Sequence, residues 1–201
     1  MRLLPDIVIA ASVLVVTITP ASAQSDIRGN EWMRGTTLSG SAGIALDSSN
    51  SGPALAGAIG WELTPRLAIE GAGSWLDLGD GRRGFGASVK TRAHLTGRHT
   101  LNPFVEGGFG LYRATFRHAD APMPHFYRRR MPMVVRVNLD NVTFTDPAFF
   151  AGGGLELRVS RRFALRPDVE TMFVFRDGRQ HLVTTIAVRA AFQIEHRPIT
   201  R

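Results

Sequence analysis

Cysteine is absent from this chain of 201 residues. Disulfide bonds, thiolate metal sites and a lipid-modified N-terminal cysteine are therefore excluded. Long apolar runs are also missing, because no segment beyond the N-terminal region reaches the ~18 consecutive apolar residues that indicate a membrane-spanning helix. Without such helices, a chain can span a membrane only as a closed β-barrel, in which the backbone hydrogen bonds are satisfied between strands.

The N-terminal region has the three parts of a secretory signal peptide. Arg2 supplies a positive charge, residues 7–18 form an almost uninterrupted apolar run, and Ala21 and Ala23 mark a small-residue cleavage site. The apolar run is too short to cross ~30 Å of hydrocarbon as a helix. We expect residues 1–23 to be a signal peptide that is cleaved on export, and residues 24–31 to lead into the folded domain.

Beyond this lead, the hydrophobic pattern has the period of two that indicates β-strands. In residues 84–96, Phe85 and Val89 lie on an apolar face, and Lys90 and Arg92 lie on the opposite face. The expected strands are residues 35–46, 54–63, 66–76, 84–96, 103–116, 149–159, 163–175 and 182–194. Lengths of about 10 to 14 residues suit tilted membrane strands better than the short strands of soluble sandwiches.

The predicted fold class is all-β: a closed, antiparallel, up-and-down transmembrane β-barrel of about eight strands over residues 32–196, with a tail at 197–201. The longest connection, 118–146, is predicted to be a long outer loop, because outer-membrane barrels have long outer loops and short periplasmic turns. Within it, residues 134–145 alternate around an Asp-Asn turn pair and predict a projecting hairpin.

The charged residues on the inner face of these strands are balanced. The lumen ion-pair candidates are six acids, Glu62, Glu70, Glu106, Glu156, Asp168 and Glu170, and six bases, Arg66, Lys90, Arg92, Arg158, Arg166 and Arg189. Buried charges must be paired, because an isolated buried charge is costly. A barrel of about eight strands is only wide enough for its side chains to fill it. We therefore predict a plugged lumen.

Aromatic and glycine residues have structural interpretations. We expect the aromatic residues near the strand ends to form interfacial girdles; they are Trp32, Trp61, Trp75, Phe104, Tyr112, Phe163, Phe173 and Phe192. The glycine runs at 107–110 and 152–154 are not followed by a helical pattern or by Gly-Lys-Ser/Thr, which argues against phosphate-binding loops. Close approaches between strands explain them better.

Two stretches carry a resemblance to a known family. Residues 102–110, with the sequence NPFVEGGFG, resemble a strand of the small OmpA/OmpX-like outer-membrane β-barrels, often called porin family proteins. Residues 152–170 look like the penultimate hairpin of that family. The resemblance implies the barrel fold, an outer-membrane location and insertion by the barrel insertion machinery. It does not imply a full OmpA-type anchoring role, because such a role needs a peptidoglycan-binding domain and we expect none here.

One departure from the family concerns the insertion signal. Family members commonly end on an aromatic residue that the insertion machinery recognises, whereas here Phe192 is followed by nine further residues. The signal is therefore expected to be internal.

Few residues suggest a catalytic or ligand-binding site. Barrel deacylases carry a His-x-Ser motif, which none of the six histidines has. Clustered arginines at Arg128, Arg129 and Arg130 are a candidate contact for lipopolysaccharide phosphates, because Arg pairs bidentately with phosphate; a solvated charge run is the alternative. The irregular spacing of His118, His125 and the methionines around them argues against a copper site. The net charge of +7 suits nucleic acid, but export argues against that partner.

The prediction is thus an outer-membrane protein, expected to be monomeric, with a structural or interaction role, no catalysis and no cofactor or metal. Residues 118–146 are its expected contact surface. Three alternatives stay open: a narrow outer-membrane channel, a soluble periplasmic lipocalin-like binding barrel with the apolar face inside, and a lipid A-modifying enzyme.

Overall fold

The computed structural model describes residues 35–48, 50–64, 66–96, 100–117, 141–160 and 162–195. The predicted signal peptide, the lead and the tail lie outside these residues. Eight antiparallel strands make up the described chain, in the order β1 (Gly35–Asp47), β2 (Ser51–Thr64), β3 (Leu67–Asp77), β4 (Arg82–His94), β5 (Leu101–Arg117), β6 (Asn141–Arg158), β7 (Phe163–Arg176) and β8 (Arg179–Glu195).

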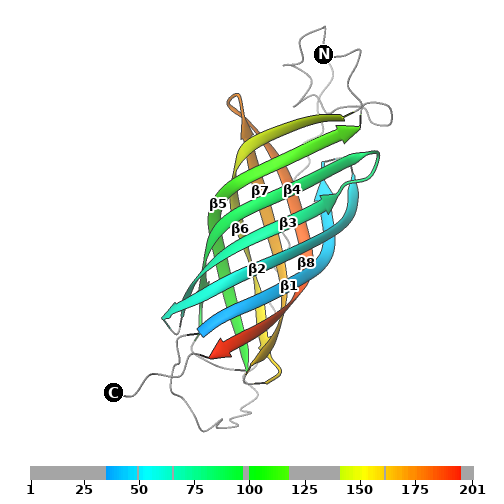
Figure 1. Ribbon diagram of the computed structural model, residues 1–201. Coiled ribbons are helices and arrows are strands. Elements are labelled where there is room, and N and C mark those ends of the chain that lie inside the picture. The colour runs from blue at the N-terminus through cyan, green and yellow to red at the C-terminus, as the bar shows by residue number, and fades with distance from the viewer. Residues whose placement is uncertain are drawn as a thin grey trace, which may run out of the picture. The chain divides into compact units, whose positions relative to one another are not determined.

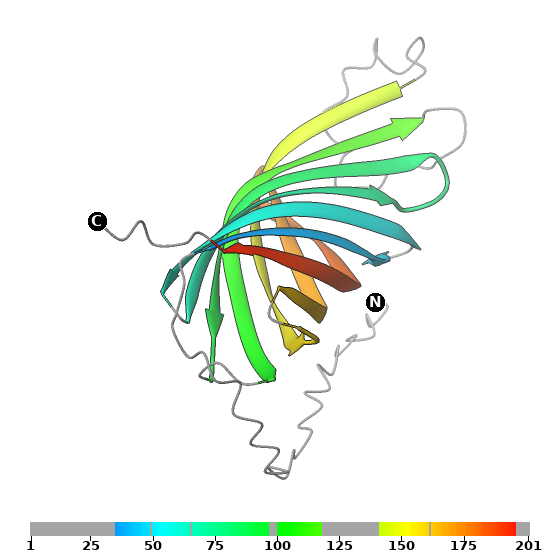
Figure 2. The ribbon, with the colours of Figure 1, turned by 60° about the horizontal axis from the view of Figure 1, so that its bottom comes forward.

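Each strand pairs with the next along the chain, and β1 pairs with β8, so the sheet closes into an up-and-down barrel. Both ribbon views show the blue first strand beside the red last strand (Figures 1 and 2). The eight predicted strands are all present, and the predicted fold class is confirmed. In the described part of the chain, no helix is long and apolar enough to cross a membrane.

Six of the strands are longer than the sequence predicts, because they extend past the apolar segments, whereas β3 and β4 keep the predicted length and are shifted by one and two residues. β6 begins at Asn141, and residues 141–146 pair with the end of β5 from Arg117 to Tyr112. The predicted long loop therefore spans 118–140 instead of 118–146. Its expected hairpin is not formed by residues 141–145, which lie in β6, and residues 134–140 lie outside the described residues.

The longer strands also shorten the connections between them. Residues 48–50 join β1 to β2, and residues 78–81 join β3 to β4, so both loops are shorter than the sequence suggests. The β7–β8 connection is the pair Asp177-Gly178. Both residues have positive φ, 52° and 72°, which the two-residue hairpin turn requires and which glycine adopts without strain. Apart from residues 118–140, the described connections at this end of the barrel are tight.

Alternation along the strands separates an apolar outer face from a filled interior. Even-numbered residues point inward on β2–β7, and odd-numbered residues point inward on β1 and β8. Outward side chains such as Phe109, which is 72% exposed, Ile44 and Val188 are apolar and uncovered. The interior holds an apolar layer toward the end that carries residues 118–140 and a charged layer in the middle and toward the opposite end.

Two aromatic residues predicted for the girdles point inward instead. Phe104 and Tyr112 have even numbers on β5, which places them in the lumen, 3% and 2% exposed. Trp61, Trp75, Phe163 and Phe192 are exposed on the outer face. The difference arises because position near a strand end says nothing about the face on which a side chain lies. Trp32 lies outside the described residues.

Candidate functional site

The candidate site is a network of paired charges across the lumen. Ten of the predicted lumen residues take part in it, five acids and five bases: Glu70, Glu106, Glu156, Asp168, Glu170, Lys90, Arg92, Arg158, Arg166 and Arg189. They come from β3, β4, β5, β6, β7 and β8. The network therefore crosses the barrel rather than following one strand.

Glu70 is the first centre of this network. Its Oε1 accepts hydrogen bonds from Arg92 and, at 3.5 Å, from Nη1 of Arg166, and its Oε2 accepts from Nη1 of Arg189 at 3.2 Å. Glu70 and Arg92 are each 1% exposed. One carboxylate thus holds three guanidinium groups from β4, β7 and β8, which ties four strands together inside the barrel.

Glu156 is the second centre. Its Oε2 accepts from Nε of Arg166 at 2.8 Å and lies 3.3 Å from Nε2 of His94, and its Oε1 accepts from Nε of Arg158 at 3.0 Å. Arg166 therefore bridges the two carboxylates. His94 also packs edge-on against Phe104, with ring centroids 6.3 Å apart, so an aromatic ring shields this part of the network.

A third group of pairs lies beside these two centres. The Lys90 ammonium contacts Glu170 and, at 3.3 Å, Oε1 of Glu106. Nε of Arg189 lies 3.2 Å from Oδ2 of Asp168, but in a poor orientation for a hydrogen bond. Charge pairing is therefore close throughout, whereas hydrogen bonding is incomplete at this contact.

The glycine runs of β5 and β6 make room for the network. A Cβ atom on Gly108 would lie 2.2 Å from the carbonyl oxygen of Val89 and 2.8 Å from Cγ of Lys90. A Cβ atom on Gly154 would lie 2.2 Å from the carbonyl oxygen of Pro167. These glycines let neighbouring strands approach closely, as the sequence suggests, and they line a packed lumen rather than a phosphate-binding loop.

Small residues on β1–β4 leave a little space on the other side of the lumen. Two neighbouring cavities of about 20 and 30 Å³ lie there, between this wall and Phe150, Glu170 and Arg189. A cavity needs about 10–15 Å³ on this measure to hold a water molecule. Each cavity therefore suits one or two waters beside the charged groups.

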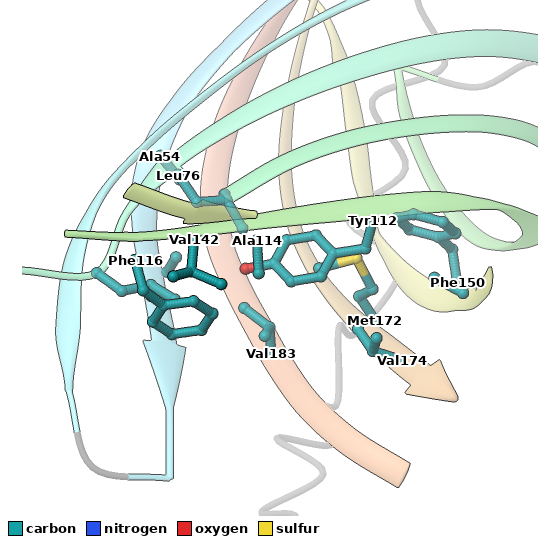
Figure 3. Packing of buried hydrophobic residues seen from close by; sticks show 13 residues of the cluster. Ala54, Leu76, Tyr112, Ala114, Phe116, Val142, Phe150, Met172, Val174 and Val183 are labelled. Atoms are coloured by element: carbon teal, nitrogen blue, oxygen red, sulfur yellow. The ribbon is translucent and has the colours of Figure 1, made fainter. Parts of the chain in front are cut away.

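An apolar layer lies above the charged network, toward the end that carries residues 118–140. Figure 3 shows its side chains, including Tyr112, Phe150, Met172 and Val183, reaching inward from different strands. Gly84 makes space for Tyr112, because a Cβ atom there would lie 2.4 Å from the tyrosine hydroxyl. The charge pattern of the sequence predicted a plug of ion pairs, and this second, apolar layer was not predicted.

Ion pairs follow again near that end of the barrel. Asp47 accepts from Nη1 of Arg82 at 3.1 Å and lies 3.4 Å from Nε2 of His181. Arg176 pairs with Asp146 at 3.1 Å, and its guanidinium lies over the Phe144 ring, 4.2 Å from the centroid. These groups were not predicted, because the apolar pattern of the sequence places Asp47, Arg82 and Asp146 in loops; strand alternation continued one to three residues further was the available signal.

Two predicted lumen residues lie apart from the network. Arg66 is exposed in the β2–β3 turn, and Glu62 is half-buried and accepts from Nε2 of Gln193 at 3.2 Å. Arg128, Arg129 and Arg130 lie outside the described residues, as do His118 and His125. In the segments that the structure describes, no group of three or more His, Cys, Asp or Glu side chains is arranged to hold a metal ion.

Comparison with known proteins gives a likeness of fold. No family model matches the chain, and no curated protein matches it in sequence. Among solved structures, Neisserial surface protein A is 8% identical, with a TM-score of 0.56, over 80% of this chain and 97% of that one. The N-terminal β-barrel domain of Pseudomonas aeruginosa OprF is 14% identical, with a TM-score of 0.53, over 78% of this chain and 97% of that domain. The chain therefore has the fold of small transmembrane β-barrels.

Proposed function

We propose that this protein is an outer-membrane β-barrel with a structural or interaction role, a closed lumen and no catalytic activity. The observation that carries the proposal is the balanced network around Glu70 and Glu156, which joins strands across the interior. Paired charges of this kind suit a rigid plug, because each charged group is compensated by a neighbour in a space that holds little water. The outer-membrane location is supported by the two proteins of similar fold.

The outer face argues for lipid over water. Large apolar side chains such as Leu55, Phe85 and Ile186 are about half exposed, and residues of this kind surround the barrel. Soluble monomers rarely expose apolar patches beyond a few hundred Å². A lipocalin-like barrel would need the opposite arrangement, with the apolar side chains of these strands inside.

The filled interior argues against a channel. The lumen cavities between the small-residue wall and Phe150 each have room for one or two waters. Above them lies the apolar layer with Met172 and Tyr112, in which the described side chains offer a passing ion no polar atom besides the Tyr112 hydroxyl. We therefore expect no steady conductance through the folded barrel.

Orientation and partners complete the proposal. Residues 118–140 form the longest connection, so their end of the barrel faces the outside of the cell by the usual rule for such barrels. Export through a cleaved signal peptide at residues 1–23 and insertion by the barrel machinery belong to the same proposal. Arg128, Arg129 and Arg130 remain proposed contacts for lipopolysaccharide phosphates.

A gel-shift experiment on fractionated cells tests the location. We expect the protein in the outer-membrane fraction, with migration on SDS gels that changes when the sample is boiled. A water-soluble periplasmic protein without a shift would refute the membrane proposal and favour the ligand-binding barrel.

Two measurements test the closed, non-catalytic lumen. In planar bilayers we expect no resolved conductance steps; steady steps would establish a channel. Mass profiles of lipid A from cells with and without the protein should be identical, and a change in acylation would establish an enzyme.

A further inference from the structure

Charged residues are confined to one region of the outer face. On the outward-facing positions of the eight strands, the charged residues are Asp77, Arg83, Arg113 and Arg117, and the other positions hold apolar, small or neutral polar residues. All four lie toward the end of the barrel that carries residues 118–140. Three of them are arginines on the adjacent strands β4 and β5. Chance scatter of surface charge would not concentrate them in this way.

The strand register brings these arginines together. Arg83 is paired with Thr115, and Phe85, two residues further along β4, is paired with Arg113. Arg83 and Arg113 are therefore diagonal neighbours on one face, a relation that places their Cα atoms about 7–8 Å apart. Side chains as long as arginine reach a common group across that separation.

Both side chains are available to a ligand. Arg83 and Arg113 are exposed, and within the described residues neither forms an ion pair. Asp77, which is paired with Arg83 across β3 and β4, uses Oδ1 to accept a hydrogen bond from the backbone N–H of Gly79 at 3.1 Å. Hydroxyl groups lie beside the arginines, because Thr115 and Thr143 are paired across β5 and β6 with their oxygens 3.3 Å apart.

Below the arginines the outer face of β5 is apolar. Along β5 from Arg113 toward the middle of the strand, the next side chains on the outer face are Leu111 and Phe109, which are 53% and 72% exposed. Trp75 and Phe85 lie in the same cross-strand row as Arg113, as aromatic residues do at a membrane interface. Arg83 and Arg113 therefore lie where the acyl region of a lipid ends and its headgroup begins.

We propose that the outer edge of β4, β5 and β6 binds a phosphorylated glycolipid of the outer leaflet, with Arg83 and Arg113 on its phosphate and Leu111 and Phe109 along its acyl chains. Guanidinium groups bind phosphate through paired N–H donors, which gives this contact both charge and geometry. The site rests on the proposed function, since it needs a barrel in the membrane with residues 118–140 outside. A lipid suits it better than a protein partner because the arginines adjoin the lipid-facing surface without a break.

Lipid binding by the full-length protein tests this site. The protein is placed in phosphatidylcholine nanodiscs, and binding of bisphosphorylated lipid A and of the same lipid A without phosphates is measured by native mass spectrometry. We expect the wild type to prefer the phosphorylated lipid, and R83Q/R113Q to weaken that binding at least tenfold, as expected for the loss of charge-assisted hydrogen bonds. R83K/R113K should retain part of the preference.

The matched control removes two exposed arginines from turns at the other end of the barrel, as R66Q/R162Q, and should bind like the wild type. Equal binding of both lipids, no loss in R83Q/R113Q, or an equal loss in the control pair would overturn the site. The site would also be overturned if R83Q/R113Q cells lost a crosslink to a protein partner while the variant still bound the phosphorylated lipid like the wild type. The boiling shift is measured on every sample: its absence from the wild type rejects the membrane barrel itself, and its presence without a lipid preference rejects only the site.

Discussion

Replacing Glu70 by Gln removes the charge that holds three arginines in the lumen. Arg92, Arg166 and Arg189 all bond to this carboxylate, which is 1% exposed. The glutamine is nearly the same size, so the change leaves the packing intact and one positive charge in excess. Removing one partner of a buried ion pair costs about 3–5 kcal/mol. We expect the free energy of unfolding of E70Q to fall by about that amount.

Urea unfolding in detergent micelles, followed by the boiling-sensitive gel shift, measures this loss. With a typical slope of about 1–3 kcal/mol per molar urea, the unfolding midpoint should fall by at least about 1 M. E62Q is the matched control, because Glu62 is only half-buried and lies apart from the network; we expect it to cost less than about 1 kcal/mol. The double variant E70Q/R92Q restores the charge balance and should recover part of the loss. Equal midpoints for E70Q, E62Q and the wild type would refute the view that the network stabilises the barrel.

Two further predictions follow from the strand packing and the outer face. G108A should destabilise the barrel by about 1–3 kcal/mol, because the added Cβ would lie 2.2 Å from the Val89 carbonyl oxygen, whereas G71A, with open space around it, should be nearly neutral in the same urea titration. Equal effects of the two substitutions would contradict the close approach of β4 and β5. Brominated acyl chains should quench the fluorescence of Trp61 and Trp75, which lie exposed on the outer face, as single-tryptophan variants can establish. Quenching of these residues by aqueous iodide instead would indicate a barrel in water.

The amino-acid sequence determined the strands and their two faces. Side chains alternate along a strand, so a local pattern such as that of residues 84–96 fixes which residues share a face wherever the strand is placed. The same alternation identified ten of the charged residues that meet in the lumen. It failed at strand ends, where Asp47, Arg82 and Asp146 were assigned to loops, because outward positions of the extended strands hold polar residues such as Arg83 and Thr143 instead of the apolar residues of the membrane belt.

Only the tertiary structure decided which charges pair and where the layers of the lumen lie. Glu70 and Arg189 are 119 residues apart, and they meet because β1 pairs with β8 and closes the barrel. The register between strands sets the height of each side chain in the lumen, and it gathers Tyr112, Phe150 and Met172 into an apolar layer above the ion pairs. It also aligns Arg83 with Arg113 on the outer face. These outcomes depend on strand register and on closure of the barrel. Both are set by all eight strands together and cannot be recognised in the sequence of a single strand.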